Sequence, residues 1–360
     1  MHLGFGLYKH MLDEQNLAFA RQCGATHIVV HLVDYFNQAS EGGARNRDNQ
    51  PVNADGGCWG MAGSPDQLWS SHELEKIKGL IEAAGLKWYA IENFDPAHWH
   101  DVLLDGPRRP EQIENVKTLI RRVGKAGIPV IGYNFSLAGV YGRIEGAFAR
   151  GGATSVGMDG HVDPNPVPDG IVWNMRLPGE RGQGTSARAC IPGEILWQRF
   201  GAFLEEVLPV AEAAGVRLAL HPDDPPVERI RDTPRLVNHP DLLERVLDYS
   251  QSPSNALEFC LGTLAEMPAG DLYAATRACA ARKRIAYVHF RNVLGTAPRY
   301  REVFIDEGSI DMARIVRILR EENYDGVLIP DHTPQMTCAA PWHAGMAYAM
   351  GYMKALLAES

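Results

Sequence analysis

Eight short apolar runs, separated by longer amphipathic segments, recur along this chain of 360 residues. In order they are Leu3–Leu7, His27–Leu32, Lys87–Glu92, Val130–Phe135, Arg217–His221, Ala256–Leu261, Ile285–Arg291 and Gly326–Asp331. Strands that alternate with helical segments predict βα units with a parallel sheet, and eight such units close a barrel. We therefore expect residues 1–360 to form one α/β domain, a (β/α)₈ TIM barrel.

The segments between these runs carry helix start and stop signals. Ser70 with Glu73 is a capping box ahead of the segment Leu74–Ala84. The segment Pro110–Ala126 has proline in its first turn and is followed by a glycine. The last helical segment, His343–Ala358, is expected to close the barrel wall.

Two connections are longer than ordinary βα loops, which usually have about 2–6 residues. They span residues 33–69 and 136–193, after the second and fourth predicted strands. Both leave the C-terminal face of the barrel, where enzymes of this architecture place their sites. We expect them to cover a substrate, and the alternative is that they are decorative or disordered insertions.

Charge and cysteine usage exclude several classes of protein. The formal net charge of -9 argues against nucleic acid or an anionic membrane as a partner, because neutralising phosphates requires clustered Lys and Arg. Six cysteines occur without a CxxC pair, which favours reduced thiols and a cytoplasmic protein. No secretory leader and no run of about eighteen apolar residues is found, so we expect a soluble protein.

Four of the predicted strands end in a side chain that binds metal ions: His221, Cys260, His289 and Asp331. The carboxyl ends of barrel strands meet on one face, so these four side chains are expected to converge. Nitrogen, sulfur and oxygen donors together suit Mn²⁺, Fe²⁺, Co²⁺ or Zn²⁺ and disfavour Mg²⁺ and Ca²⁺. An ion held there would keep positions free for a substrate carboxylate and hydroxyl.

Polar residues surround the four expected ligands. Asp223 and Asp224 could orient the first histidine, or could simply be solvated acids in a stiff proline turn. Arg291 shares the strand face of His289 and could clamp a carboxylate, the alternative being a surface ion pair. Asn292, the next residue, points away or enters the loop.

Proton transfer is expected from His332, which follows Asp331 directly and has a side chain that titrates near neutral pH. Three further residues, at the end of the fourth strand and in the loop after it, are candidates for holding hydroxyls and a carboxylate: Tyr133, Asn134 and Arg143. For Tyr133 we weigh core packing as the stronger alternative. Glu92 and His31 end earlier strands, and either could be a base or, more simply, a structural hydrogen-bonding residue.

Several phrases of the sequence resemble the mannonate dehydratases, (β/α)₈ barrels of the xylose-isomerase-like group. They are Glu92-Asn-Phe, Tyr133-Asn-Phe135, His221-Pro-Asp-Asp-Pro-Pro226, Cys260-Leu-Gly-Thr263, His289-Phe-Arg-Asn-Val293, Ile310-Asp-Met312 and Pro330-Asp-His332. The resemblance covers most of residues 72–135 and 195–335. It implies that His221, Cys260, His289 and Asp331 bind Mn²⁺, with Fe²⁺, Co²⁺ or Zn²⁺ as alternatives. It also implies a role for His332 in proton transfer.

The chain departs from the family pattern in three places. After Phe135 it reads Ser136-Leu-Ala-Gly-Val-Tyr-Gly-Arg143, and only the arginine corresponds to the family. The stretch before Asp311 lacks the family's histidine. After His332 the sequence Thr-Pro-Gln-Met replaces a glycine-rich phrase, and His343 or Tyr348 takes the place of the family's catalytic tyrosine.

The resemblance implies a hydro-lyase that removes water from a sugar acid such as D-mannonate, giving a 2-keto-3-deoxy acid. The expected catalytic residues are His332, Arg143, Arg291, Tyr133 and His343, and the expected substrate contacts are Asn134, Asn292 and Asp223. The alternatives are a metal-dependent isomerase or epimerase, and a non-catalytic protein that binds sugar acids. A phosphodiester-cleaving barrel fits least, because no basic stripe is present. We expect a homo-oligomer, as is common for such barrels.

Overall fold

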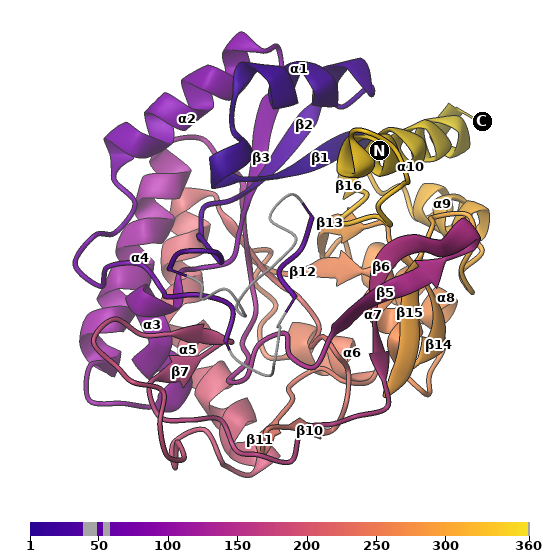
Figure 1. Ribbon diagram of the computed structural model, residues 1–360. Coiled ribbons are helices and arrows are strands. Elements are labelled where there is room, and N and C mark those ends of the chain that lie inside the picture. The colour runs from indigo at the N-terminus through magenta and orange to yellow at the C-terminus, as the bar shows by residue number, and fades with distance from the viewer. Residues whose placement is uncertain (39–48, 53–57, 359–360) are drawn as a thin grey trace.

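A computed structural model of the chain describes residues 1–38, 49–52 and 58–358 (Figure 1). Its centre is a closed barrel of parallel strands in the order β1-β16-β13-β12-β9-β4-β3-β2. These strands are β1 (His2–Tyr8), β2 (His27–His31), β3 (Lys87–Glu92), β4 (Val130–Tyr133), β9 (Arg217–Leu220), β12 (Asn255–Cys260), β13 (Ile285–His289) and β16 (Val327–Ile329). The predicted (β/α)₈ barrel is therefore confirmed.

Each barrel strand coincides with one of the eight apolar runs. The run Lys87–Glu92 matches β3 at both ends, whereas Val130–Phe135 and Ile285–Arg291 leave the sheet two residues early, at Tyr133 and His289. Beyond those positions the chain enters the loops of the C-terminal face. The residues that end each run therefore stand at the rim of the barrel.

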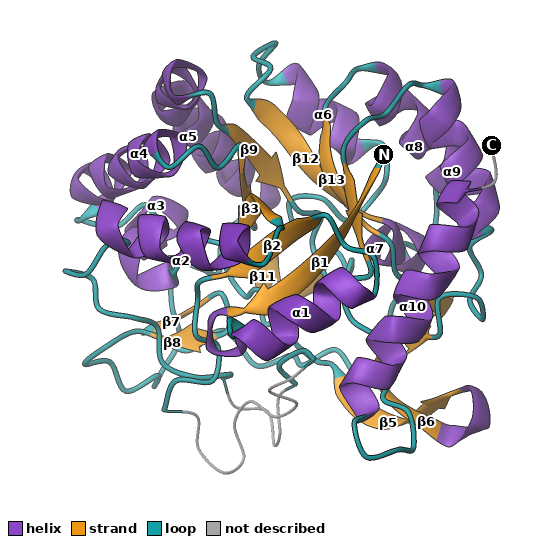
Figure 2. Cartoon of the chain, turned by 90° about the horizontal axis from the view of Figure 1, so that it is seen from above, coloured by secondary structure: helices purple, strands orange, loops and turns teal. Residues whose placement is uncertain are grey.

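Helices surround the barrel, as the view from above shows (Figure 2). They are α1 (Glu14–Gln22), α2 (Ser71–Ala83), α3 (Pro96–Leu104), α4 (Arg109–Lys125), α5 (Gly193–Ala214), α6 (Leu242–Asp248), α7 (Leu261–Glu266), α8 (Leu272–Ala281), α9 (Met312–Glu321) and α10 (Pro341–Ala358). The predicted cap is present at α2, where the Ser70 hydroxyl accepts a hydrogen bond of 3.1 Å from the backbone N–H of Glu73. Among the described residues, no helix combines the length and the apolar character that crossing a membrane requires.

Side chains alternate between the inside of the barrel and the helix layer. The interior is filled by small and β-branched residues with one tyrosine: Val29, Ala90, Val130, Ala219, Ala256, Tyr287, Val327 and Ile329. Because the side-chain period of a strand is two residues, the residues two and four positions further along also point inward. This alternation decides which residues of the rim face the barrel axis.

The two long connections differ in what the structure describes of them. Residues 39–48 and 53–57 of the 33–69 loop lie outside the described residues. The 136–193 loop contains β5 (Ile144–Ala149), β6 (Ala153–Asp159), β7 (Ile171–Val172) and β8 (Met175–Arg176). In Figure 1, β5 and β6 lie beside β14 (Asn292–Thr296) and β15 (Arg299–Val303) in one antiparallel sheet, ordered β14-β15-β6-β5. The second loop is thus tied to the connection that follows β13.

Candidate active site

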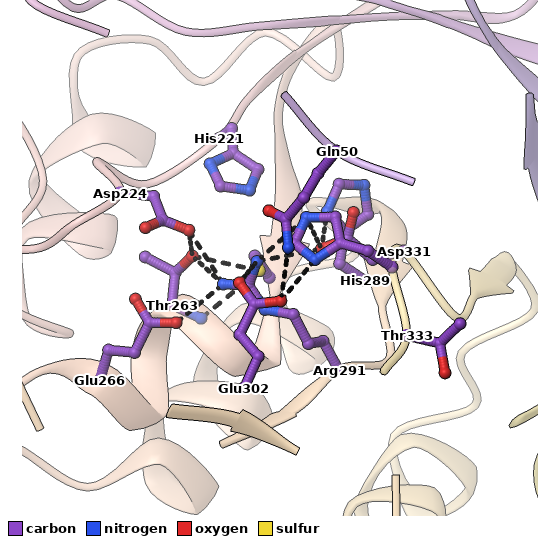
Figure 3. Close-up of polar contacts among 12 residues, drawn as sticks. Gln50, His221, Asp224, Thr263, Glu266, His289, Arg291, Glu302, Asp331 and Thr333 are labelled. Carbon is purple, nitrogen blue, oxygen red and sulfur yellow. Dashed lines mark hydrogen bonds and ion pairs between the residues drawn. The ribbon is translucent and has the colours of Figure 1, made fainter. Parts of the chain in front are cut away.

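Three of the expected metal ligands meet above the barrel axis. His221 follows β9, Cys260 is the last residue of β12 and His289 is the last residue of β13. One donor atom from each side chain lies within 4.8 Å of the other two. Figure 3 shows the imidazoles of His221 and His289, which come from β9 and β13, the two strands on either side of β12. The geometry is that of a group able to hold one ion between them.

Asp331 lies beside this group, two residues after β16 ends. Its Oδ2 is 3.5 Å from His289 Nδ1 and 3.3 Å from His332 Nε2. Its backbone has a φ of 62°, in the left-handed region that aspartate tolerates better than most residues. That turn brings a carboxylate to the open side of His289 and completes a mixed set of N, S and O donors.

The surroundings of Cys260 favour its thiolate. Burial alone would raise the pKa of this thiol, but Arg291, His221 and His289 outweigh burial and lower the pKa well below its usual value. The sulfur also accepts hydrogen bonds from the N–H and hydroxyl of Thr263, at 3.4 and 3.2 Å. A thiolate is the form that binds a metal ion.

Buried polar atoms around His289 lack well-aligned partners among the described residues. Neither ring nitrogen of His289 makes a hydrogen bond within the described part of the chain. Nε2 lies 3.1 Å from Glu258 and 3.4 Å from Glu92, but these contacts are not well aligned. Buried polar groups are nearly always satisfied in folded proteins. A metal ion bound to Nδ1 would satisfy that nitrogen, and the N–H at Nε2 could then donate to the carboxylates. Histidines that bind metal ions usually donate their other ring N–H to a carboxylate in this way. The residues present therefore fit a divalent transition metal ion.

The two carboxyl groups behind His289 differ in protonation. Burial and the nearby charge of Glu92 raise the pKa of Glu258 to about 8. For Glu92 burial acts in the same direction, but His31 and His289 outweigh it and lower its pKa to about 2. One member of the pair is thus a carboxylate and the other a carboxylic acid near neutral pH. Two like charges are avoided at this depth in the barrel.

Arg291 lies at the centre of a buried ion cluster (Figure 3). Its guanidinium contacts four carboxylates, those of Asp224, Glu266, Glu302 and Asp331, at 2.9, 3.0, 3.2 and 3.3 Å. The side chain is only 3% exposed, so the alternative of a surface ion pair is wrong. Because both terminal nitrogens of the guanidinium are engaged by protein, Arg291 compensates charge and is not free to clamp a substrate.

Arg143 approaches the same cluster from the loop after β4. It makes close contacts with Asp224 and with the side-chain oxygen of Gln50, and lies 3.5 Å from Glu302. Gln50 belongs to the 33–69 loop, and its amide also donates to Glu302 at 2.9 Å. Both long loops therefore contribute a side chain to the pocket, which Arg143 and Gln50 line.

His332 is held by a carboxylate that comes from β15. Its Nδ1 lies 2.7 Å from Glu302 Oε2. A carboxylate only accepts hydrogen bonds, so Nδ1 carries a proton, while Nε2 lies 3.3 Å from Asp331 Oδ2 and 3.4 Å from a nitrogen of Arg291. Burial would raise the pKa of Glu302, but His332, Arg291 and Arg143 outweigh it and keep this group ionised. The arrangement leaves one nitrogen of His332 for proton exchange in the pocket.

The opposite wall of the pocket is built by the first four strands and is richer in neutral groups. Asn134 Nδ2 donates to Asn93 Oδ1 at 2.8 Å, and Asn93 Nδ2 donates to the Tyr35 hydroxyl at 3.0 Å. His31 Nδ1 is 3.2 Å from the same hydroxyl. Asn134, an expected substrate contact, therefore lines the pocket within a hydrogen-bonded row.

Two expected catalytic residues lie away from the pocket. Tyr133 points outward from β4 into the helix layer, where its ring packs against Phe94, Trp99 and Phe203. His343 lies on α10, with Nε2 at 3.2 Å from the side-chain oxygen of Asn16. Strand alternation explains the first case, since Gly132 and not Tyr133 faces inward. These placements correct the expectation of a catalytic role for either residue.

Two expected substrate contacts are structural instead. The carboxylate of Asp223 accepts hydrogen bonds from the backbone N–H groups of Leu236 and Val237, at 2.6 and 2.8 Å. The amide of Asn292 donates to the carbonyls of Ile305 and Ile310, at 2.9 and 3.1 Å. Both side chains use their hydrogen bonds to hold the backbone of nearby loops. This corrects the expectation that they contact the substrate.

Five polar residues of the site were not expected from the sequence: Gln50, Tyr35, Glu258, Glu266 and Glu302. Glu258 carries a signal, because a charged residue two positions before Cys260 must share its inward face. The other four lie in loops, on a short helix or on a strand outside the barrel. The hydrophobic periodicity of the sequence does not show where such segments lie relative to the barrel.

Comparison with known proteins agrees with this geometry. The family model of D-mannonate dehydratase (UxuA) matches residues 1–356. Mannonate dehydratases from Streptococcus equi subsp. zooepidemicus and Streptococcus pneumoniae are 36% and 34% identical over 276 and 279 residues, covering 74% of this chain and 75% of each relative.

Solved structures extend the likeness to the whole chain. The crystal structure of mannonate dehydratase from Streptococcus suis serotype2 superposes with a TM-score of 0.76 and 28% identity, covering 99% of this chain and 92% of that one. An L-ribulose 3-epimerase, 16% identical with a TM-score of 0.56, shares the fold alone. By its sequence and its structure, the chain belongs to the D-mannonate dehydratase family of hydro-lyases.

Proposed function

We propose that this protein removes water from a sugar acid such as D-mannonate and releases a 2-keto-3-deoxy acid. The observation that carries the proposal is the group His221, Cys260 and His289, with Asp331 beside it and His332 at the edge of the same pocket. Donors for an ion and a group for proton transfer thus lie within reach of one bound molecule.

The ion that this donor set fits is Mn²⁺, with Fe²⁺, Co²⁺ or Zn²⁺ as alternatives. His221, Cys260, His289 and Asp331 would hold it. When bound, it supplies Lewis-acid stabilisation of negative charge that develops beside the substrate carboxylate. The Nε2–H of His289 would then face Glu258 and Glu92, which orient the ring.

Proton transfer, charge compensation and substrate binding are carried out by side chains of the protein. His332 Nε2 is suited to protonate the departing hydroxyl when the ring is an imidazolium, because Glu302 at Nδ1 orients the ring and stabilises its positive charge. Arg143 gives the pocket positive charge opposite the substrate carboxylate, and Arg291 neutralises the acids behind it. Asn134 offers an amide to a sugar hydroxyl.

The partner in this proposal is a small sugar acid, with neither nucleic acid nor membrane as ligand, and the protein is a homo-oligomer. All six cysteines are free, which supports a reducing, cytoplasmic setting.

Purified protein, loaded with Mn²⁺, is offered D-mannonate and a panel of other aldonates, and products are followed by mass. Loss of one water from the substrate is the expected result, and His332→Gln should lower the rate about 100-fold or more. No turnover of any aldonate would contradict the proposal. A product of unchanged mass would instead identify an isomerase or epimerase.

A further inference from the structure

Removing water from two neighbouring carbons requires two proton transfers. A base takes the proton from one carbon, and an acid protonates the hydroxyl that leaves the other. His332 has only Nε2 available, because Nδ1 is committed to Glu302 at 2.7 Å. A second proton-transfer group is therefore needed in the same pocket.

The wall formed by the first strands contains a second histidine paired with a glutamate. His31 ends β2, with Nε2 at 3.4 Å from Glu92 Oε2, and the two side chains are 15% and 8% exposed. Because a carboxylate beside Nε2 favours a proton on that nitrogen, we assign the imidazole proton to Nε2, which leaves Nδ1 as the acceptor. The group 3.2 Å from Nδ1 is the Tyr35 hydroxyl, which must then donate to it.

The direction of this hydrogen bond is fixed from the other side as well. Asn134 donates to Asn93, whose Nδ2 in turn donates to the Tyr35 oxygen at 3.0 Å. The hydroxyl oxygen is thus already an acceptor, and its own proton is left for His31. Donors run in one direction from Asn134 to His31, whose Nε2 faces Glu92, and a histidine activates a hydroxyl in hydrolases in the same way.

We propose that Tyr35 is the second catalytic residue, and that His31 and Glu92 are positioning residues that accept and stabilise its proton. The Tyr35 oxygen takes the proton from the carbon next to the carboxylate as the Tyr35 hydrogen moves to His31 Nδ1. The electron pair of the broken C–H bond first delocalises into the carboxylate, so that the abstraction is reversible, and then forms the C=C bond as the neighbouring hydroxyl leaves as water with the Nε2 proton of the His332 imidazolium. When the enol product becomes the ketone, the enol hydroxyl gives its proton back to His332, the carbon that lost its hydroxyl takes a proton from Tyr35, and the His31 imidazolium, which faces Glu92, returns a proton to Tyr35.

Protonation states in the resting protein support this assignment. Burial lowers the pKa of His31 and raises that of Tyr35, so the ring is neutral and the phenol keeps its hydrogen. Trp59 and Trp173 pack edge-on or tilted against Tyr35, with ring centroids 5.5 Å away, and hold the phenol in place.

The test compares two tyrosines that differ only in position. Tyr35→Phe removes the hydroxyl of the relay, whereas Tyr133→Phe removes a buried hydroxyl in the helix layer. In D₂O, deuterium entry at the carbon next to the carboxylate of an aldonate should fall about 100-fold or more in Tyr35→Phe. Tyr133→Phe should stay within about twofold, and metal content should equal that of the unaltered protein in both. Equal exchange rates in the two variants would overturn the proposal.

A second readout does not depend on turnover. In metal-free protein with ¹⁵N-labelled histidine, the His31 signals, assigned by their loss in His31→Gln, should show a protonated Nε2 and an unprotonated Nδ1. The Nδ1 signal should shift in Tyr35→Phe and stay unchanged in Tyr133→Phe. A proton on Nδ1 of His31 would exclude the relay whatever reaction the enzyme catalyses.

This inference rests on the proposed function only in taking a sugar acid as substrate, and the two can fail separately. If water is lost and Tyr35→Phe is as fast as the unaltered protein, the role of Tyr35 is wrong and the dehydration stands. If the protein exchanges the carbon-bound proton without losing water, and Tyr35→Phe stops that exchange, Tyr35 acts as proposed and the dehydration is wrong. Absence of both exchange and dehydration contradicts both.

Discussion

Two halves of the barrel rim carry different chemistry. In the first, which we call the charged half, strands β9, β12, β13 and β16 lead into the group of ligands and the cluster around Arg291. In the second, the hydrogen-bonding half, β1 to β4 lead into a row of amides, phenol and imidazole that ends on Glu92. Charge is concentrated around the donors that would hold the proposed ion. Neutral donors line the wall where hydroxyl groups of the proposed substrate would bind.

The largest effect should come from the charged half, at Cys260. Cys260→Ala removes the thiolate donor, so metal content and activity should fall by more than the roughly 10- to 100-fold typical of changes behind a metal site. Cys279→Ala is the matched control, because that thiol is buried in α8 and burial raises its pKa to about 12. Elemental analysis and rates on both variants check this. Full metal content in Cys260→Ala would contradict the assigned ligand set.

Loss of the central cation should cost stability. Arg291→Met keeps most of the side-chain volume but leaves Asp224, Glu266 and Glu302 buried without their partner. Breaking a buried ion cluster in this way should lower the free energy of unfolding by about 3–5 kcal/mol. Denaturant unfolding of metal-free protein measures it. As a comparison, Arg277→Met at a half-exposed ion pair should cost about 1 kcal/mol or less.

A smaller effect is expected at Glu302, which acts only through other side chains. Glu302→Gln weakens the hold on His332, so kcat should fall about 10- to 100-fold, as for other orienting carboxylates, with little change in KM. Steady-state kinetics separates the two constants. Glu307→Gln, which changes a half-buried residue of the same connection outside the pocket, should behave like the unaltered enzyme. A change confined to KM would show that Glu302 contacts the substrate instead.

The smallest effect should come from the hydrogen-bonding half. Asn134→Ala removes one amide that faces the pocket, worth about 1 kcal/mol, so KM should rise about fivefold. Asn292→Ala is the informative comparison, because its amide ties a loop outside the pocket and should affect stability and not KM. If the two variants changed KM equally, the division of the rim into two halves would not describe substrate binding.

The sequence was sufficient for the parts of the molecule that depend on local pattern. Apolar runs predicted all eight barrel strands, and the polar residue at the end of a run predicted where His221, Cys260 and His289 would stand. Tyr133 could also have been placed correctly, because an inward Gly132 requires its neighbour to point outward.

What could not be predicted depends on contacts between segments far apart in the chain. Glu302 reaches His332 only because β15 pairs with β14 and β6 outside the barrel. Gln50 reaches Arg143 across 93 positions of sequence. Neither spacing nor hydropathy encodes such pairings, so the residues that orient and neutralise the site appear only in the folded structure.

The pairing of β6 with β15 has a consequence for exchanging substrate specificity between relatives. Arg299, Tyr300 and Arg301 are in register with Asp159, Met158 and Gly157, and a side chain on Gly157 would collide with the carbonyl of Tyr300. The two segments therefore form one interlocking module. A graft of residues 136–193 alone would leave β15, which carries Glu302, paired with a foreign β6, whereas moving residues 292–310 with them transfers the long loop and the orienting carboxylate together.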